Sequence, residues 1–261
     1  MILDEIVNKT TERITVKKRT YPLESIKQEA LRKKTVSGFA FEESLRKRGM
    51  SFICEVKKAS PSKGIIAEEF PYLKIAREYE QAGAAAVSVL TEPFYFGGND
   101  SFLSEIAKAV DIPVLRKDFV VDEYMIYEAR LLGASAVLLI ASILGEQLRD
   151  FIDTAHSLGL SALVEAHTAE EVTLALGSGA RIIGVNNRNL HTFEVDTENS
   201  IRLKNLVTED IIFVSESGIK TPQDIKKLKE NGINAVLIGE TLMRSDNKKE
   251  ALQRLRGADN E

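Results

Sequence analysis

Short apolar segments alternate with longer amphipathic segments along most of this chain, and this alternation constrains its fold more than any other feature. The apolar segments predict eight strands, at residues 51–57, 85–90, 112–117, 135–140, 160–165, 181–186, 211–215 and 235–238. The amphipathic segments predict helices near 71–82, 100–109, 122–132, 145–158, 168–177, 199–206, 221–231 and 246–256. Strands that alternate with helices are joined by crossovers, so we expect a parallel sheet in an α/β fold.

Capping residues and glycines mark several of the predicted junctions. Thr168 with Glu171, and Thr221 with Asp224, have the spacing of a capping box at the start of a helix. Five predicted helices are followed by a glycine, which is favoured at a left-handed helix end: Gly83, Gly133, Gly159, Gly179 and Gly232. Eight repeats within 261 residues favour a single closed (β/α)8 TIM barrel. A doubly wound open sheet is the alternative, but no glycine-rich dinucleotide-binding turn follows the first strand.

Residues 1–48 precede the alternation and predict an N-terminal helical extension packed on the barrel of residues 49–261. A basic stretch near residues 17–19 is expected to separate its first two apolar stripes. Three apolar stripes predict the docking segments of this extension: Ile2, Leu3, Ile6 and Val7, then Leu23, Ile26, Ala30 and Leu31, and then Phe39, Phe41 and Leu45. We expect the extension to cap one end of the barrel.

Composition and charge exclude several classes of protein. A formal net charge of -4 argues against a general nucleic-acid-binding protein, because no face is expected to be strongly basic. No apolar run is long enough to span a membrane, and the N-terminus lacks the basic start and apolar core of a secretory signal. Cys54 is the single cysteine and cannot form an internal disulfide, which fits a cytoplasmic protein. The three histidines show no metal-ligand spacing, so we expect no metal site.

Charged and polar residues gather where the predicted strands end. Residues two apart share one face of a strand, so Glu55 and Lys57 lie together at the end of the first strand. The ends of later strands carry, in chain order, Lys117, Glu165, Asn186 with Arg188, Glu216 with Ser217 and Gly218, and Gly239. The carboxyl ends of all strands meet at one face of a barrel, where active sites lie. We therefore predict one polar pocket.

Each of these residues also has a purely structural interpretation. Lys117 could be an exposed turn lysine, Glu165 could pair with an outer helix, and Asn186 with Arg188 could stiffen a turn. The charged face of the first strand could be a solvated sheet surface. Arg116 is out of phase with its neighbours and is assigned to structure or solvent. The structural interpretations would have to hold independently at five strand ends, whereas one shared pocket explains them together.

The residue types of this pocket suit proton transfer on a phosphorylated substrate. Two lysines and two glutamates around one cavity would perturb each other's pKa values. A lysine there could donate a proton to a carbonyl oxygen or form a Schiff base, and the composition does not choose between these. Gly218 and Gly239 could let backbone N–H groups approach a phosphate after the last two strands.

Six segments resemble one known family, that of indole-3-glycerol phosphate synthase. They are EVKKASPSKG at 55–64, SVLTE at 88–92 with YFGG at 95–98, LRKDF at 115–119, LVEAH at 163–167, GVNNRNL at 184–190 and SESGI at 215–219. The resemblance covers essentially the whole chain. It implies closure of 1-(2-carboxyphenylamino)-1-deoxyribulose 5-phosphate to indole-3-glycerol phosphate, with release of carbon dioxide and water, in tryptophan biosynthesis. It also implies no metal or organic cofactor.

The resemblance further implies roles for individual residues. Lys117 would be the general acid, and Lys57 would hold an anionic group of the substrate and assist departure of hydroxide. Glu165 and Glu55 would position these lysines and accept protons. Other implied contacts are to sugar hydroxyls or the carboxylate (Asn186, Arg188, Ser217 and Glu216), to the aryl ring (Phe96, Phe119, Leu138 and Leu190), and to phosphate (Ser60, Gly218 and Gly239).

Two features and two alternatives remain open. Some family members have serine where this chain has Glu240, and we expect the Glu240 carboxylate to point away from the phosphate. The loop from Lys57 to Phe70 is predicted to close as a lid. The alternatives are another phosphate-binding isomerase or Schiff-base aldolase that uses Lys117, and a non-catalytic ligand-binding barrel. We expect a monomer or weak homo-oligomer.

Overall fold

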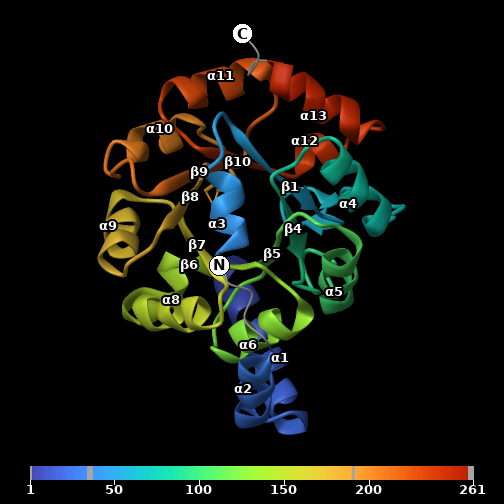
Figure 1. Cartoon of the computed structure of the whole chain (residues 1–261), viewed down its shortest axis with the longest axis vertical. Coiled ribbons are helices and arrows are strands. Elements are labelled where there is room, and N and C mark those ends of the chain that lie inside the picture. Colours follow the sequence, from blue (N-terminus) through green and yellow to red (C-terminus); the bar gives the residue numbers. More distant parts are fainter. Residues whose placement is uncertain (1, 34–37, 190–191, 258–261) are drawn as a thin grey trace.

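Eight parallel strands close into a barrel in the computed structural model, which describes residues 2–33, 38–189 and 192–257 (Figure 1). The strands are β1 (Ser51–Val56), β4 (Ala86–Leu90), β5 (Val114–Lys117), β6 (Ala136–Ile140), β7 (Ser161–Ala166), β8 (Ile182–Asn186), β9 (Ile212–Glu216) and β10 (Ala235–Ile238). Each pairs with the next in the sequence, and β10 pairs with β1 to complete the ring. The predicted TIM barrel is confirmed, and the open sheet is excluded.

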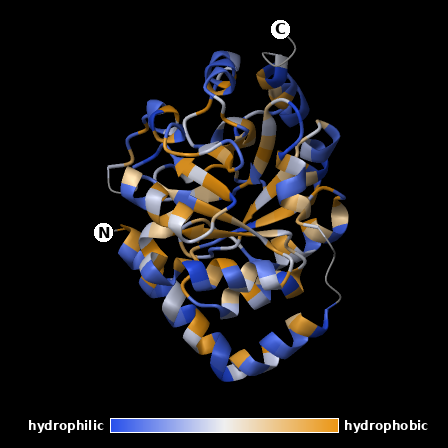
Figure 2. Ribbon diagram, turned by 60° about the vertical axis from the view of Figure 1, so that its left-hand side comes forward, coloured by the Kyte–Doolittle hydropathy of each residue, from blue (hydrophilic) through white to orange (hydrophobic). Residues whose placement is uncertain are grey.

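A ring of helices surrounds the strands (Figure 1). These helices are α4 (Tyr72–Gln81), α5 (Asp100–Ala109), α6 (Tyr124–Leu132), α8 (Leu148–Ser157), α9 (Ala169–Gly177), α10 (Glu198–Lys204), α11 (Pro222–Glu230) and α13 (Lys248–Arg256). Apolar and hydrophilic stripes alternate around them, while the strands are mainly apolar (Figure 2). Thr221 and Asp224 form the complete predicted capping box. All five predicted terminal glycines have positive φ, between 72° and 93°.

The strands separate two apolar cores, as their two-residue period requires. Ile53, Leu115 and Leu163 belong to the core inside the barrel. Phe52 and Cys54, their out-of-phase neighbours, belong to the core between the barrel and the helices. Glu55 is in phase with Ile53 and is only 3% exposed. The charged face of the first strand therefore lies inside the barrel and is no solvated sheet surface.

The extension differs from its prediction in two details. Its helices are α1 (Ile2–Thr20), α2 (Leu23–Arg32) and α3 (Ala40–Leu45). The basic stretch that we expected to follow the first helix forms its last turn, because Lys17 and Lys18 pair with acidic side chains of the barrel and cations suit a helix C-terminus. Leu31, predicted to dock, is 59% exposed, because it is turned about 100° from the buried Ala30.

The extension reaches both ends of the barrel. Phe41 and Leu45 of α3 are buried in the inner core, and Ser51, at the start of β1, donates to the carbonyl of Ser44. At the opposite end, Ile2 and Ile6 of α1 border the central cavity. The capping that we predicted for one end thus occurs at both. A domain boundary at residue 48 stays a prediction.

Five short elements were absent from the prediction. They are the hairpin of β2 (Ala59–Ser60) and β3 (Gly64–Ile65), the helices α7 (Ala141–Leu144) and α12 (Glu240–Met243), and the 3-10 turn η1 (Gly145–Gln147). Such two- to four-residue elements are too short to show a hydrophobic period. Among the described helices, none is long and apolar enough to cross a membrane.

Candidate active site

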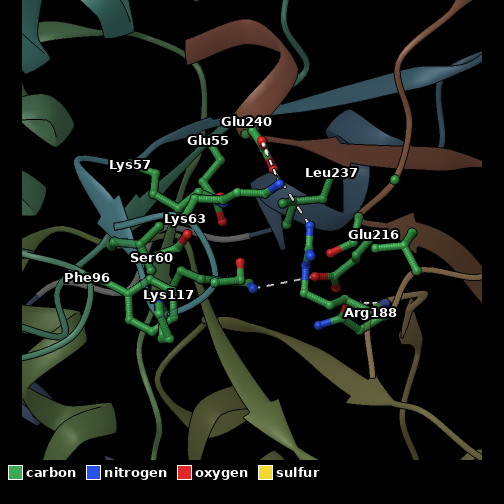
Figure 3. A pocket seen from close by; sticks show the side chains of 18 of the residues that line it. Glu55, Lys57, Ser60, Lys63, Phe96, Lys117, Arg188, Glu216, Leu237 and Glu240 are labelled. Atoms are coloured by element: carbon green, nitrogen blue, oxygen red, sulfur yellow. Dashed lines mark hydrogen bonds and ion pairs between the residues drawn. The ribbon is translucent and has the colours of Figure 1, made fainter. Parts of the chain in front are cut away.

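A cavity of about 730 Å³ opens at the carboxyl ends of the barrel strands (Figure 3). Leu190, predicted to contact the aryl ring, lies outside the described residues. Every other predicted site residue lines this cavity: Glu55, Lys57, Ser60, Phe96, Lys117, Phe119, Leu138, Glu165, Asn186, Arg188, Glu216, Ser217, Gly218 and Gly239. Closure of the sheet thus brings together side chains that lie up to 184 residues apart (55 to 239) in the sequence.

Lys117, the last residue of β5, lies among buried carboxylates. Its Nζ atom is 3.4 Å from Glu165 Oε2 and 3.5 Å from Glu216 Oε2. Burial alone would lower the pKa of Lys117, but the negative charges of Glu216, Glu165 and Glu55 outweigh it and raise that pKa well above its usual range. The side chain is 15% exposed toward the cavity. Lys117 is therefore a desolvated ammonium, and the exposed-turn interpretation is wrong.

Glu55 and Lys57 form a second ion pair at the end of β1. Lys57 Nζ is 2.6 Å from Glu55 Oε2, and the two side chains are 17% and 4% exposed. Burial tends to raise the pKa of Glu55, but Lys57 and then Lys117 outweigh this and hold the pKa below its usual range. Glu55 is thus an anion between two ammonium groups.

Glu165, on β7, is held by three side chains. Besides Lys117, the Asn186 side-chain amide donates to Glu165 Oε1 at 3.3 Å, and His167 Nε2 lies 3.7 Å from the same oxygen. Burial raises the pKa of Glu165, but Lys117 and His167 together lower it below its usual value. No role was predicted for His167, which belongs to the LVEAH segment. Burial lowers its pKa, but Glu171, Glu165 and Glu216 outweigh the burial and raise that pKa above its usual value.

Glu171 explains why His167 adopts this position. The capping box predicted for Thr168 and Glu171 is only half formed: Thr168 accepts from the Glu171 N–H, as expected. The Glu171 carboxylate accepts instead from the backbone N–H of His167 and lies 3.5 Å from its Nδ1. His167 therefore stands between two carboxylates, one inside the cavity and one on α9.

Glu216, at the end of β9, is the carboxyl group least able to ionise. Its Oε1 atom is buried and accepts no hydrogen bond from the described residues. Burial, with repulsion from Glu165 and Glu55, outweighs the attraction of Lys117 and raises the pKa of Glu216 to about 7. The side chain occupies the space where a Cβ atom on Gly184 would lie. Glu216 can therefore exchange a proton near neutral pH.

The loops after β9 and β10 provide an approach for an anion. Ser217 and Gly218 have φ of 67° and 83°, which is unusual for serine. A Cβ atom on Gly239 would overlap the Glu55 carboxylate and lie 2.9 Å from Lys57 Nζ. Only a glycine fits there without displacing the ion pair. The backbone of Gly239 thus lies directly against the Glu55–Lys57 ion pair.

An aromatic pair forms the other wall of the cavity. The rings of Phe96 and Phe119 lie 5.8 Å apart between centroids. The loop that carries Phe96 is fixed by Glu92, a fully buried residue whose carboxylate accepts from the backbone N–H groups of residues 94, 95 and 96. Glu92 was not predicted to matter, because a single glutamate after a strand gives no sign that it accepts three local hydrogen bonds.

Arg116 belongs to structure and not to solvent. Its guanidinium is fully buried, with Nη2 2.8 Å from Asp100 and 2.7 Å from Glu128. The neighbouring Asp118 accepts two hydrogen bonds, at 2.9 and 3.0 Å, from Arg13 of α1. The extension is thus ion-paired to the residue that follows Lys117.

Glu240 contradicts the prediction that it points away. Its carboxylate lies inside the cavity, where dashed lines in Figure 3 join it to Lys63 and Arg188. Lys63 and Arg188, with Arg244 at 3.2 Å, attract the carboxylate toward the cavity. Within the described ranges, no group of three or more His, Cys, Asp or Glu side chains could hold a metal ion.

Comparison with known proteins identifies the family. The family model for indole-3-glycerol phosphate synthase matches residues 3–255. The chain belongs to the indole-3-glycerol phosphate synthase family. A relative named indole-3-glycerol phosphate synthase from Ruminiclostridium cellulolyticum is 55% identical, over 99% of this chain and 100% of its own. One of the same name from Endomicrobium trichonymphae is 56% identical, over 98% of this chain and 100% of its own.

Solved structures with low identity share the fold alone. A 3-hexulose-6-phosphate synthase matches with a TM-score of 0.65 and 16% identity, over 80% of this chain and 99% of its own. Thiamine phosphate pyrophosphorylase from Pyrococcus furiosus matches with a TM-score of 0.61 and 16% identity, over 84% of this chain and 97% of its own. These barrels support the architecture of the family, while its chemistry depends on the residues at the strand ends.

Proposed function

We propose that this cavity converts 1-(2-carboxyphenylamino)-1-deoxyribulose 5-phosphate to indole-3-glycerol phosphate, with Lys117 as the general acid. The reaction is that of the family to which the chain belongs, an indole-3-glycerol phosphate synthase of tryptophan biosynthesis and a carboxy-lyase. The observation that supports the choice of Lys117 is its position: a desolvated ammonium within 3.5 Å of two buried carboxylates.

Ring closure is the step that needs an acid. The aryl carbon that bears the carboxylate attacks the ketone carbon, and the ketone oxygen becomes an alkoxide. An alkoxide is far more basic than an amine, so Lys117 donates its proton although its own pKa is raised. The same ammonium stabilises the developing negative charge in a cavity from which most water is excluded. Loss of carbon dioxide then restores the aromatic ring.

Dehydration is assigned to the remaining pairs. Glu165, held by Asn186, accepts the proton released as the five-membered ring becomes aromatic. Lys57 donates the proton that lets hydroxide leave as water, and Glu55 holds this ammonium at 2.6 Å. Glu216 binds a sugar hydroxyl, donating or accepting according to its own protonation state.

The two ends of the substrate fit the two walls of the cavity. The phosphate lies against Ser60 and the backbone N–H groups of Gly218 and Gly239, next to Lys57. The aryl ring lies against Phe96, Phe119 and Leu138, and Arg188 with Ser217 orients the carboxylate or hydroxyls. The finer expectations stay with this proposal: a cytoplasmic enzyme, without nucleic-acid or membrane partners, that acts as a monomer or weak homo-oligomer.

The test is continuous fluorescence of the purified protein mixed with the carboxyphenylamino substrate. We expect formation of the indole product in the wild type and at least about a thousandfold loss of kcat in Lys117→Ala, as for removal of a general acid together with its charge. Lys226→Ala, an exposed lysine of α11, is the matched control and should remain active. Product formation that survives Lys117→Ala would refute the assignment of the acid. A lysine adduct trapped by borohydride would favour the aldolase alternative instead.

A further inference from the structure

The Glu240 carboxylate occupies the part of the cavity that the proposed function gives to an anion. Glu240 follows Gly239 and begins α12. Its Oε1 atom lies 3.7 Å from Lys63 Nζ, and its Oε2 atom lies 3.7 Å from Arg188 Nη2. The side chain is 30% exposed, so the carboxylate is neither buried in the core nor free in solvent. One internal anion thus stands between two cations of the cavity.

The two residues that Glu240 bridges come from two separate loops. Lys63 lies in the turn between β2 and β3, within the segment predicted to act as a lid. Arg188 follows β8, and its Nη1 atom also donates to the carbonyl of Phe193 at 3.2 Å. Figure 3 shows both cations directed toward the Glu240 carboxylate across the mouth of the cavity. The carboxylate therefore holds the lid segment and the loop after β8 to α12.

A third cation, Arg244, already pairs with Glu240 and lies closer to it than Lys63 or Arg188. Arg244, one helical turn further along, places its Nε atom 3.2 Å from Glu240 Oε1. The Arg244 side chain is 51% exposed, compared with 21% for Arg188. If the Glu240 side chain kept Arg244 and gave up its two longer contacts, its charge would stay paired and the space between Lys63 and Arg188 would be cleared.

We propose that Glu240 is an internal counter-anion, which bridges Lys63 and Arg188 in the ligand-free cavity and keeps only Arg244 when an anionic group of the substrate binds. This rests on the proposed function, because it takes the phosphate end of that substrate as the competing anion. An incoming anion must displace a carboxylate that already satisfies the two cations. Small anions then bind weakly, whereas the whole substrate gains further contacts at the aromatic wall.

The test uses inorganic phosphate as the probe, titrated into the full-length protein in a calorimeter. Removing the competing charge in Glu240→Gln should tighten phosphate binding about tenfold, since a repelling carboxylate is lost and two cations are freed. Arg244→Gln should act in the opposite direction and weaken it about threefold, because the displaced carboxylate loses its partner. Glu230→Gln, at an exposed position of α11, is the charge-matched control and should bind phosphate like the wild type.

Hydrogen exchange supplies a readout that does not depend on phosphate. Amides of residues 58–66 should exchange faster in ligand-free Glu240→Gln than in the wild type, because Lys63 loses its anchor. Unchanged or weaker phosphate binding in Glu240→Gln, or tighter binding in Arg244→Gln, would overturn the proposal. Product formation by the wild type is measured separately. If that fails while phosphate binding follows the predicted order, the reaction is wrong and the counter-anion role stands.

Discussion

Glu216→Gln should stabilise the protein at alkaline pH, although it removes an ionisable carboxyl group from the cavity. The pKa of Glu216 is raised to about 7, from an ordinary value of 4.5, mainly by burial. A carboxyl group with a raised pKa in the folded state favours folding while it is protonated, and this contribution is lost as pH rises from about 4.5 through about 7. The difference of about 2.5 pKa units, at about 1.36 kcal/mol each, is about 3 kcal/mol.

Glutamine is neutral at every pH and nearly isosteric, so it removes this cost. We expect the free energy of unfolding of Glu216→Gln to exceed that of the wild type by up to about 3 kcal/mol at pH 8, and by little at pH 5. Urea unfolding gives the free energy of unfolding of each protein at the two pH values. The change between pH 5 and pH 8 is then compared between the wild type and Glu216→Gln, so that the titration of all other groups cancels. Glu230→Gln controls for loss of one surface charge.

Two results would refute this reasoning. Equal pH dependence in the wild type and Glu216→Gln would mean that Glu216 titrates normally. A variant that is less stable at pH 8 would mean that the anion is held favourably, with Lys117 at 3.5 Å contributing more than burial removes.

Three further predictions concern residues around the site. Gly184→Ala should destabilise the protein by about 2 kcal/mol or more, measured by urea unfolding, because its methyl group would overlap the buried Glu216 carboxylate; unchanged stability would show that this carboxylate moves freely. Arg13→Ala should cost about 2 kcal/mol in the same assay, because it removes the closer of the two guanidinium groups that pair with a fully buried aspartate and leaves only Arg116 at 3.6 Å; a loss below about 1 kcal/mol would contradict the importance of this ion pair. His167→Gln should move the acid limb of the kcat/KM profile to higher pH, because His167 lowers the pKa of Glu165; an unshifted profile would show that His167 does not affect this carboxylate.

The barrel could be predicted because the hydrophobic period of each segment and the alternation of strands with helices along the chain indicate the same fold. Predicted and observed strand limits differ by at most two residues, as in 112–117 against Val114–Lys117, since six of the eight strands are mainly apolar runs that begin two or three residues after a glycine. The two-residue period also placed Glu55 and Lys57 on one face, which then had to be the inner one. Closure of the barrel supplied the rest of the cavity.

The errors lie where a long-range partner decides the structure. The first helix continues through Lys17 and Lys18 because acidic residues about a hundred positions later pair with them. The Glu240 carboxylate was expected to point away from a phosphate, which would repel it, whereas Arg188 and Lys63 attract it into the cavity. His167 had no motif of its own, and its place between two carboxylates follows from β7 and α9 together. The contact of Leu190 with the aryl ring stays a prediction.

The ion pairs of α1 have a consequence for the charge around the cavity. Arg13, Lys17 and Lys18 neutralise acidic side chains in the loop after β5 and on α5 and α6. A chain that began after residue 20 would keep those acidic groups and lose the three cations that pair with them, including the partner of Asp118, the residue after Lys117. Its electrostatic potential at the cavity mouth would turn more negative, and a substrate that carries both a phosphate and a carboxylate would be repelled on approach. Truncation would therefore slow substrate capture most at low ionic strength, and added salt would restore part of the rate.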